Sequence, residues 1–164
     1  MGIMVKIPLR GGISGGCQCG AIRYRIASRL GKAGICHCRM CQKAFGNFGA
    51  ALVSVKAEVL EWTRGTPASF RSSAIVSRGF RRDCGTPLFM REDGDAMIEI
   101  AIGTLDDPNA IPAMTEQSGI ESKVNWFDAL RDLPRQATTD DRSPGDMMRL
   151  ESLQHPDHDT EHWP

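Results

Sequence analysis

The sequence has no long apolar run and no excess of charge of either sign. Lys plus Arg number 20 and Asp plus Glu number 20, so the formal net charge is zero. A balanced surface offers no basic face for nucleic acid or for an anionic membrane. No stretch approaches the roughly 18 apolar residues of a membrane span. The opening residues, MGIMVKIPLRGG, also lack the apolar core of a signal peptide. We therefore expect a cytoplasmic protein with no nucleic-acid and no membrane partner.

Cysteine is present, but not in the setting of a disulfide framework. The chain has six cysteines in 164 residues, and it is long enough to bury a hydrophobic core without covalent help. In a reducing compartment, closely spaced cysteines bind metal more often than they form disulfides. The cysteines therefore point to metal binding.

Short segments between turn residues predict a mostly β fold. Apolar and polar residues alternate clearly in AMIEIAIG, and the other candidate segments are rich in β-branched or aromatic residues. Two short helices are expected, within 39–49 and over 125–133, the second with Trp126, Leu130 and Leu133 on one face. The expected strands lie at 21–26, 49–55, 58–62, within 65–71, and at 74–80, 87–92 and 96–103.

Composition divides the chain into three parts. Residues 1–12 form a lead-in, residues 13–135 a single domain, and residues 136–164 a polar tail rich in Asp, Pro and Ser. The tail has no sustained apolar period, so we expect it to be disordered or weakly ordered.

Three histidines in the tail offer a second reading. His155, His158 and His162 are spaced by three and four residues, which would put them on one face of a helix. Pro156 argues against that helix. A polar, disordered end is the favoured interpretation.

Five of the cysteines form two close groups, Cys17-x-Cys19 and Cys36-x-Cys38-x-x-Cys41. Zinc takes four tetrahedral ligands, with thiolates at about 2.3 Å. The second group can face one ion from a single loop and leave the fourth position open, which is typical of a catalytic zinc. The alternative is that these residues are small buried apolar side chains, as free cysteines often are.

Cys17 and Cys19 need partners from elsewhere in the chain. The segment GFRRDCGTPL supplies Cys84, but no second cysteine, so this group would hold three sulfurs. His37 is a further candidate ligand. Because neighbours in an extended segment point to opposite sides, we expect His37 to support the ligands from behind or to be exposed.

Four stretches together resemble the glutathione-dependent formaldehyde-activating enzyme family, which shares its domain with centromere protein V. The resemblance runs from about residue 14 to 134. It implies an Mss4-like fold of antiparallel β-sheets with short helices and zinc-binding loops. The stretches are GGCQCGAIRY, CHCRMCQKAFG, SRGFRRDCGTPLF and ESKVNWFDAL.

The resemblance also implies two Zn²⁺ sites. One is a catalytic-type site with an open position, and the other is structural. Position by position, the first corresponds to Cys36, Cys38 and Cys41, and the second to Cys17, Cys19 and Cys84.

The family's fourth structural ligand falls at Arg81, which departs from the pattern. A guanidinium cannot ligate a metal because it has no free lone pair. Three outcomes are open: water or Asp83 completes the shell, the site is empty, or Arg81 leaves a marginal protein. We expect a weakened but occupied site, since three thiolates still attract zinc.

The implied function is that of a zinc-dependent carbon–sulfur lyase, acting on a thiol–aldehyde adduct as S-(hydroxymethyl)glutathione synthase does. Its partner would be a small-molecule thiol such as glutathione. Arg39, Lys43, Arg78 and Arg81 are either attractors of that anion or ordinary surface charges. The alternative function is a non-enzymatic zinc-binding module that binds a protein partner.

Overall fold

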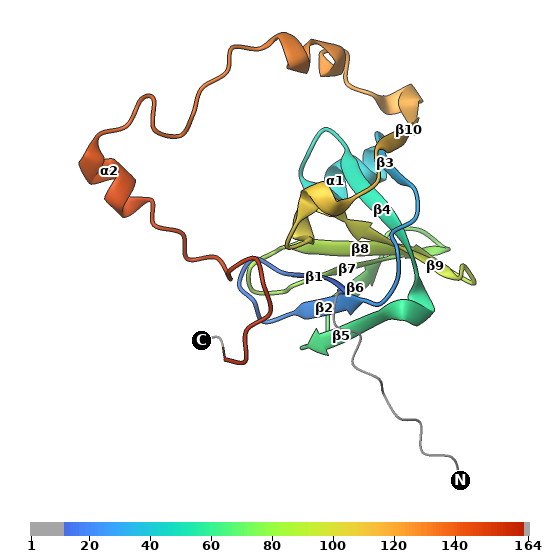
Figure 1. Ribbon diagram of the computed structural model, residues 1–164. Helices are drawn as coiled ribbons and strands as arrows, with labels where there is room; N and C mark the ends of the chain where they lie inside the picture. Colours follow the sequence, from blue (N-terminus) through green and yellow to red (C-terminus); the bar gives the residue numbers. More distant parts are fainter. Residues whose placement is uncertain (1–11, 163–164) are drawn as a thin grey trace.

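A computed structural model describes residues 12–162, and the strands of this part of the chain form two β-sheets (Figure 1). The smaller sheet has three antiparallel strands in the order β1-β2-β5. These are β1 (Ile13–Gly16), β2 (Arg23–Ile26) and β5 (Leu60–Arg64). The predicted lead-in lies, but for residue 12, outside the described residues.

The larger sheet has seven strands in the order β10-β3-β4-β9-β8-β7-β6. All neighbours are antiparallel except β10 and β3, which run parallel at one edge. The prediction of a mostly β, Mss4-like architecture with short helices is confirmed, with this one parallel pair. The strands are β3 (Ala33–Cys36), β4 (Ala50–Lys56), β6 (Ala68–Arg71), β7 (Val76–Phe80), β8 (Pro87–Glu92), β9 (Met97–Ala101) and β10 (Met114–Ser118).

The described residues include two short α-helices, α1 (Arg39–Phe45) and α2 (Pro144–Arg149). Neither they nor any other described helix is long and apolar enough to cross a membrane. The other helical segments described are 3-10 helices: Ala57–Val59, Ile102–Thr104, Pro108–Ala110, Ile120–Ser122 and the longer Phe127–Asp132.

The prediction of an amphipathic helix with one apolar face over 125–133 is wrong, because the type of helix differs. The segment is the 3-10 helix Phe127–Asp132, with backbone bonds three residues apart. Three residues per turn do not collect the predicted apolar positions on one buried stripe. Trp126 and Leu133 accordingly stay half exposed, at 50% and 56%.

The main core lies between the two sheets. Tyr24 and Ile26 of β2 meet Val53 of β4 and Ile100 of β9, and all four are fully buried. The Tyr24 hydroxyl shares a 2.8 Å hydrogen bond with the Thr104 hydroxyl, so this buried polar group is satisfied.

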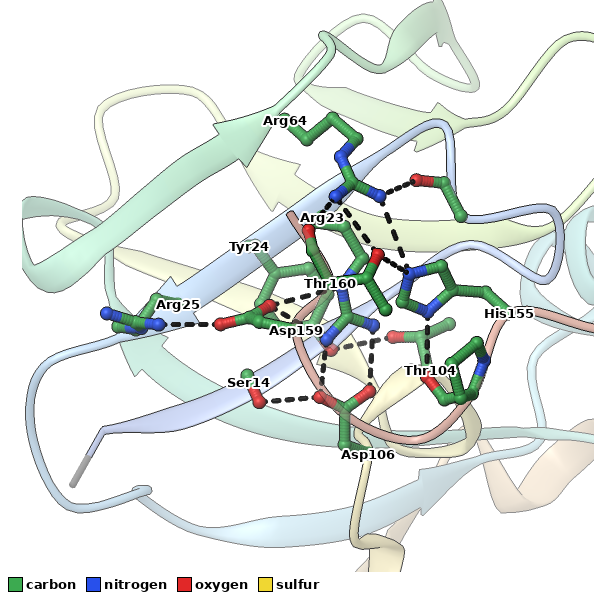
Figure 2. A network of polar contacts seen from close by, with 12 residues as sticks. Ser14, Arg23, Tyr24, Arg25, Arg64, Thr104, Asp106, His155, Asp159 and Thr160 are labelled. Carbon is green, nitrogen blue, oxygen red and sulfur yellow. Dashed lines mark hydrogen bonds and ion pairs between the residues drawn. The ribbon is translucent and has the colours of Figure 1, made fainter. Parts of the chain in front are cut away.

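The C-terminal segment arcs away from the sheets and returns to the smaller one (Figure 1). On its return the His155 amide donates to the Gln18 carbonyl at 2.9 Å. The Asp159 carboxylate then pairs with Arg23 at 3.0 Å and with Arg25 at 2.6 Å (Figure 2). Residues 155–160 are therefore fastened to β2.

These contacts were not expected from a polar, low-complexity tail. His155 is buried, whereas His158 and His162 are exposed, and no helix aligns the three. The contacts form because β2 buries Arg23 between Asp106 and Asp159, a pairing that composition does not reveal. The division of the chain at residue 135 stays a prediction.

Candidate metal centre

Two groups of three cysteines stand out in the described structure. Within each group the three Sγ atoms lie within 4.8 Å of one another. All six cysteines fall in the described range and none of them forms a disulfide. The groups are those that the sequence suggested: Cys36, Cys38 and Cys41, and Cys17, Cys19 and Cys84.

The first group is built where β3 runs into α1. Cys36 ends β3, Cys38 is the N-cap of α1, and Cys41 lies in its first turn. The Cys41 amide donates to the Cys38 Sγ at 3.4 Å, as N-cap side chains accept from the third helical residue. One tight strand-to-helix turn therefore aims all three sulfurs at one point.

Strand β10 holds this turn from the side. The His37 amide donates to the Ser118 carbonyl at 2.8 Å. Although burial raises the pKa of the Cys36 thiol, hydrogen bonds from the Ser118 hydroxyl and from the Cys38 backbone lower it, and the net shift is downward. Cys41 behaves differently, because its burial raises the pKa to about 12.

His37 is fully buried, so the alternative of an exposed His37 is wrong. Its Nε2 lies 3.0 Å from the Gln117 Oε1, and its ring meets that of Phe127 edge to face at 4.7 Å. The side chain belongs to neither cysteine group. It instead packs β10 and the following 3-10 helix against the cysteine turn.

A cavity of about 250 Å³ opens beside Cys36. Ser118, Ser54 and Glu99 line it with Lys32. The Ser54 hydroxyl donates to the Glu99 carboxylate. Burial, followed by the charges of neighbouring carboxylates, raises the pKa of Glu99. No local sequence pattern indicates this cavity, because β3, β4, β8, β9 and β10 bring its walls together from distant positions.

The four basic residues singled out from the sequence fall in different places. Arg39 and Lys43 are exposed on α1, where they border a hollow that Trp126 also lines. Arg78 is only 3% exposed, and its Nη2 lies 3.4 Å from the Cys41 Sγ. Arg78 is therefore not a surface charge.

The second group joins the end of the β1 hairpin to the turn between β7 and β8. The Cys17 Sγ lies 3.5 Å from the Cys19 Sγ and accepts from the Ile22 amide at 3.2 Å. Burial raises the pKa of Cys17 to about 11. Burial acts the same way on Cys84, but hydrogen bonds from Thr86 outweigh it and bring its pKa to about 7.

Arg81 stands beside this second group. Its guanidinium pairs with the Asp83 carboxylate. A hydrogen bond to Cys19, with the charge of Asp83, raises the pKa of Arg81. The Asp83 side chain is 72% exposed and does not join the three sulfurs. Of the outcomes considered, completion of the shell by Asp83 is not the arrangement that the structure contains.

Both groups fit zinc by their donor chemistry. Thiolate sulfur is a preferred zinc ligand, and three such ligands leave one tetrahedral position for water or a substrate atom. Each group also adjoins a cavity, one of about 250 Å³ beside Cys36 and one of about 410 Å³ lined by Cys17 and Cys84. The cavities alone therefore do not decide which group carries chemistry and which is structural.

A family model and a solved structure match this chain. A family model described as glutathione-dependent formaldehyde-activating enzyme matches residues 12–118, which include all six cysteines. No curated protein matches the chain. A Rhodobacter sphaeroides protein of known crystal structure is 20% identical, with a TM-score of 0.49, over 56% of this chain and 86% of that one.

Proposed function

Because the chain belongs to the glutathione-dependent formaldehyde-activating enzyme family, we propose that it makes or breaks the carbon–sulfur bond of a thiol–aldehyde adduct. In the forward direction the thiol sulfur bonds to the aldehyde carbon, and the thiol proton ends on the aldehyde oxygen. The reverse step returns both reactants. This is a carbon–sulfur lyase activity resembling that of S-(hydroxymethyl)glutathione synthase.

One observation carries the proposal: three cysteine sulfurs converge next to a cavity that is also lined by the carboxyl group of Glu99. Cys36, Cys38 and Cys41 would hold Zn²⁺ with one position free. A bound zinc would favour the thiolate form of a substrate thiol, or polarise the aldehyde oxygen. Since Cys36 lines the cavity, a substrate lying there would reach the metal position from the Cys36 side.

The cavity also contains a group suited to the proton that moves in this reaction. Burial raises the pKa of Glu99, so it holds a proton to a higher pH than an exposed glutamate does. General acid–base groups work best when their pKa lies near the working pH. We assign to Glu99 the transfer of the proton between thiol and aldehyde oxygen.

Glutathione is the thiol that we propose first. Lys32 and Arg91 line the cavity beside Cys36, but so do the carboxylates of Glu92, Asp95, Glu99 and Glu116, and Arg39 and Lys43 border a separate hollow. The choice of glutathione therefore rests on the family match and not on the charge of the cavity. The setting that we propose is the reducing cytoplasm, where the cysteines stay available for metal. No nucleic-acid or membrane partner enters the proposal.

Exchange between formaldehyde, glutathione and their adduct can be followed by NMR with ¹³C-labelled formaldehyde. We expect the zinc-loaded protein to speed this exchange. Cys36→Ser should abolish the acceleration, while Cys84→Ser, in the other group, should keep most of it in correctly folded protein. If the zinc-loaded protein accelerates exchange for none of the thiols tested, the alternative of a non-enzymatic zinc-binding module is favoured.

A further inference from the structure

Arg78 is a buried cation without a carboxylate partner in the described chain. It lies on β7, and its side chain is almost wholly excluded from solvent. Its Nε donates to the Ser72 hydroxyl at 3.0 Å, and its Nη2 donates to the Cys41 Sγ at 3.4 Å. Its Nη1 is buried and has no hydrogen-bond partner among residues 12–162.

The register of the sheet explains why this guanidinium meets the cysteines. Arg78 lies directly opposite Met90 on β8, so the two side chains share a face of the sheet. Met90 packs against the small cluster that contains Cys41 and Leu52. Arg78 therefore projects to the face that carries α1 and its cysteines.

The other side of Arg78 offers no anion. There it lines a cavity of about 170 Å³ whose walls are largely aromatic. The phenyl rings come from Phe45, Phe70, Phe80 and Phe89. Within the described structure, the group next to Arg78 that can carry negative charge is thus the sulfur of Cys41.

Burying a charge is costly unless an opposite charge or hydrogen bonds compensate it. Three thiolates around one divalent zinc carry a net charge of minus one, which a single guanidinium would neutralise. We propose that Arg78 is the buried counter-charge of the Cys36–Cys38–Cys41 metal centre and positions Cys41 toward the metal. The inference rests on the metal site of the proposed function, but not on the reaction assigned to it.

The proposal makes the effect of Arg78 depend on the metal. In the zinc-loaded protein the guanidinium faces a negatively charged centre and stabilises it. In the metal-free protein the same guanidinium is a buried charge that faces no carboxylate among residues 12–162. Removing the charge should therefore weaken zinc binding and leave the metal-free fold as stable as before, or more stable.

Arg78→Met removes the charge but keeps a long side chain, and Arg78→Lys keeps the charge but removes the guanidinium. Arg82→Met is the control. Arg82 lies exposed in the turn after β7. Zinc retention is measured for the full chain against a competing chelator. Alkylation followed by peptide mapping then reports which cysteines the metal still protects. Thermal unfolding of the zinc-loaded and metal-free forms is measured alongside.

We expect Arg78→Met to weaken zinc retention at Cys36, Cys38 and Cys41 about tenfold or more. Protection of Cys17 and Cys84 should not change, and Arg78→Lys should retain part of the affinity. The metal-free midpoint should stay equal or rise. Unchanged zinc retention in Arg78→Met, or equal destabilisation of both forms, would overturn the proposal. If Arg78→Met does not fold, Arg78→Gln takes its place, and unchanged zinc retention in that uncharged variant would overturn the proposal.

These readouts are independent of catalysis. A chain that binds zinc in the Arg78-dependent way but accelerates no thiol–aldehyde exchange would contradict the proposed function and support the role of Arg78. If Arg78→Met holds zinc as tightly as the unchanged chain and catalyses exchange equally well, the role of Arg78 is contradicted and the proposed function is supported.

Discussion

Gly119 lies directly against the backbone of Cys38: a Cβ at Gly119 would stand 2.6 Å from the Cys38 nitrogen. Gly119 has a left-handed backbone with φ of 61°, and it follows the last residue of β10. The edge strand β10 is therefore in close contact with the turn that carries three cysteines. The shape of this metal centre depends on a segment about 80 residues away in the sequence.

Gly119→Ala should damage the Cys36–Cys38–Cys41 centre. The substitution adds the strain of a left-handed alanine and a collision with the backbone of Cys38. We expect a loss of at least about 2 kcal/mol in the free energy of unfolding, together with weaker zinc retention. Chemical denaturation and zinc analysis measure the two effects.

Gly46→Ala is the matched control for this test. Gly46 is also left-handed, with φ of 58°, but a Cβ there would meet no atom within 4 Å. It should cost about 1 kcal/mol and leave zinc retention unchanged. If the two substitutions cost the same stability and leave zinc retention equally unchanged, Gly119 is needed only for its left-handed backbone and not for its close contact with Cys38.

Arg81→Cys should strengthen metal binding at the second cysteine group. The new thiol would give Cys17, Cys19 and Cys84 a fourth sulfur, which closes a tetrahedral zinc site. The unfolding midpoint should rise in the presence of zinc and stay close to its original value in metal-free protein. Thermal scans with and without a chelator measure the difference.

The control for this variant is Arg81→Ser, which removes the charge and adds no thiol. It should leave the Asp83 carboxylate without its partner but give little of the zinc-dependent gain. A rise of the same size in both variants would mean that the positive charge, rather than the missing ligand, limits the site.

Glu99→Gln should raise stability and lower activity. A carboxyl group whose pKa is raised in the folded state binds its proton more tightly there than in the unfolded chain. Its contribution is fully present below the ordinary value of about 4.5 and is lost as pH rises through the higher folded pKa.

At neutral pH the amide avoids the cost of burying a charge, so Glu99→Gln should unfold at a higher temperature than the unchanged chain. The variant should also show a flatter pH dependence of stability and slower thiol–aldehyde exchange. Unfolding curves across pH 4 to 8 and the NMR exchange assay measure these changes. Unaltered exchange would remove Glu99 from the proposed mechanism.

Asp159→Asn should loosen the C-terminal segment from β2. Burial opposes ionisation of Asp159, but hydrogen bonds from Arg25 and Arg23 outweigh it and lower the pKa. The stability that it contributes is complete above the usual Asp range and is lost as pH falls through the lower folded pKa. Because the side chain is about one-third exposed, we expect a loss of about 1 kcal/mol.

Hydrogen exchange over β2 should increase in Asp159→Asn and not in Asp157→Asn. Asp157 is an exposed carboxylate in the same segment, and no ion pair is recorded for it among residues 12–162. Equal exchange in the two variants would mean that the ion pairs of Figure 2 do not fasten the tail.

The sequence was informative where a local pattern carries the structure. β9 was found from its alternation, and α1 from the segment after the cysteines. Both cysteine groups followed from spacing and family resemblance. By contrast, β1, β3 and β10 are four or five residues long and rich in glycine or polar side chains. They are strands because neighbours pair with them, which a local pattern does not reveal.

The environment of the cysteines was equally hidden. Arg78, Ser118 and Gly119 reach the first cysteine group through sheet pairing and chain return, far from Cys36 in sequence. The departure at Arg81 was visible from the sequence, whereas its ion pair with Asp83 was not.

The most direct test of the account is the number of zinc ions per chain by native mass spectrometry, with and without glutathione. We predict two zinc ions per chain and a glutathione adduct that forms only while Cys36, Cys38 and Cys41 hold their metal. The Cys36→Ser variant should lose the adduct and keep the zinc of the second group. Zinc content and mass that are indifferent to glutathione and to other thiols would contradict a catalytic role for the three-cysteine centre.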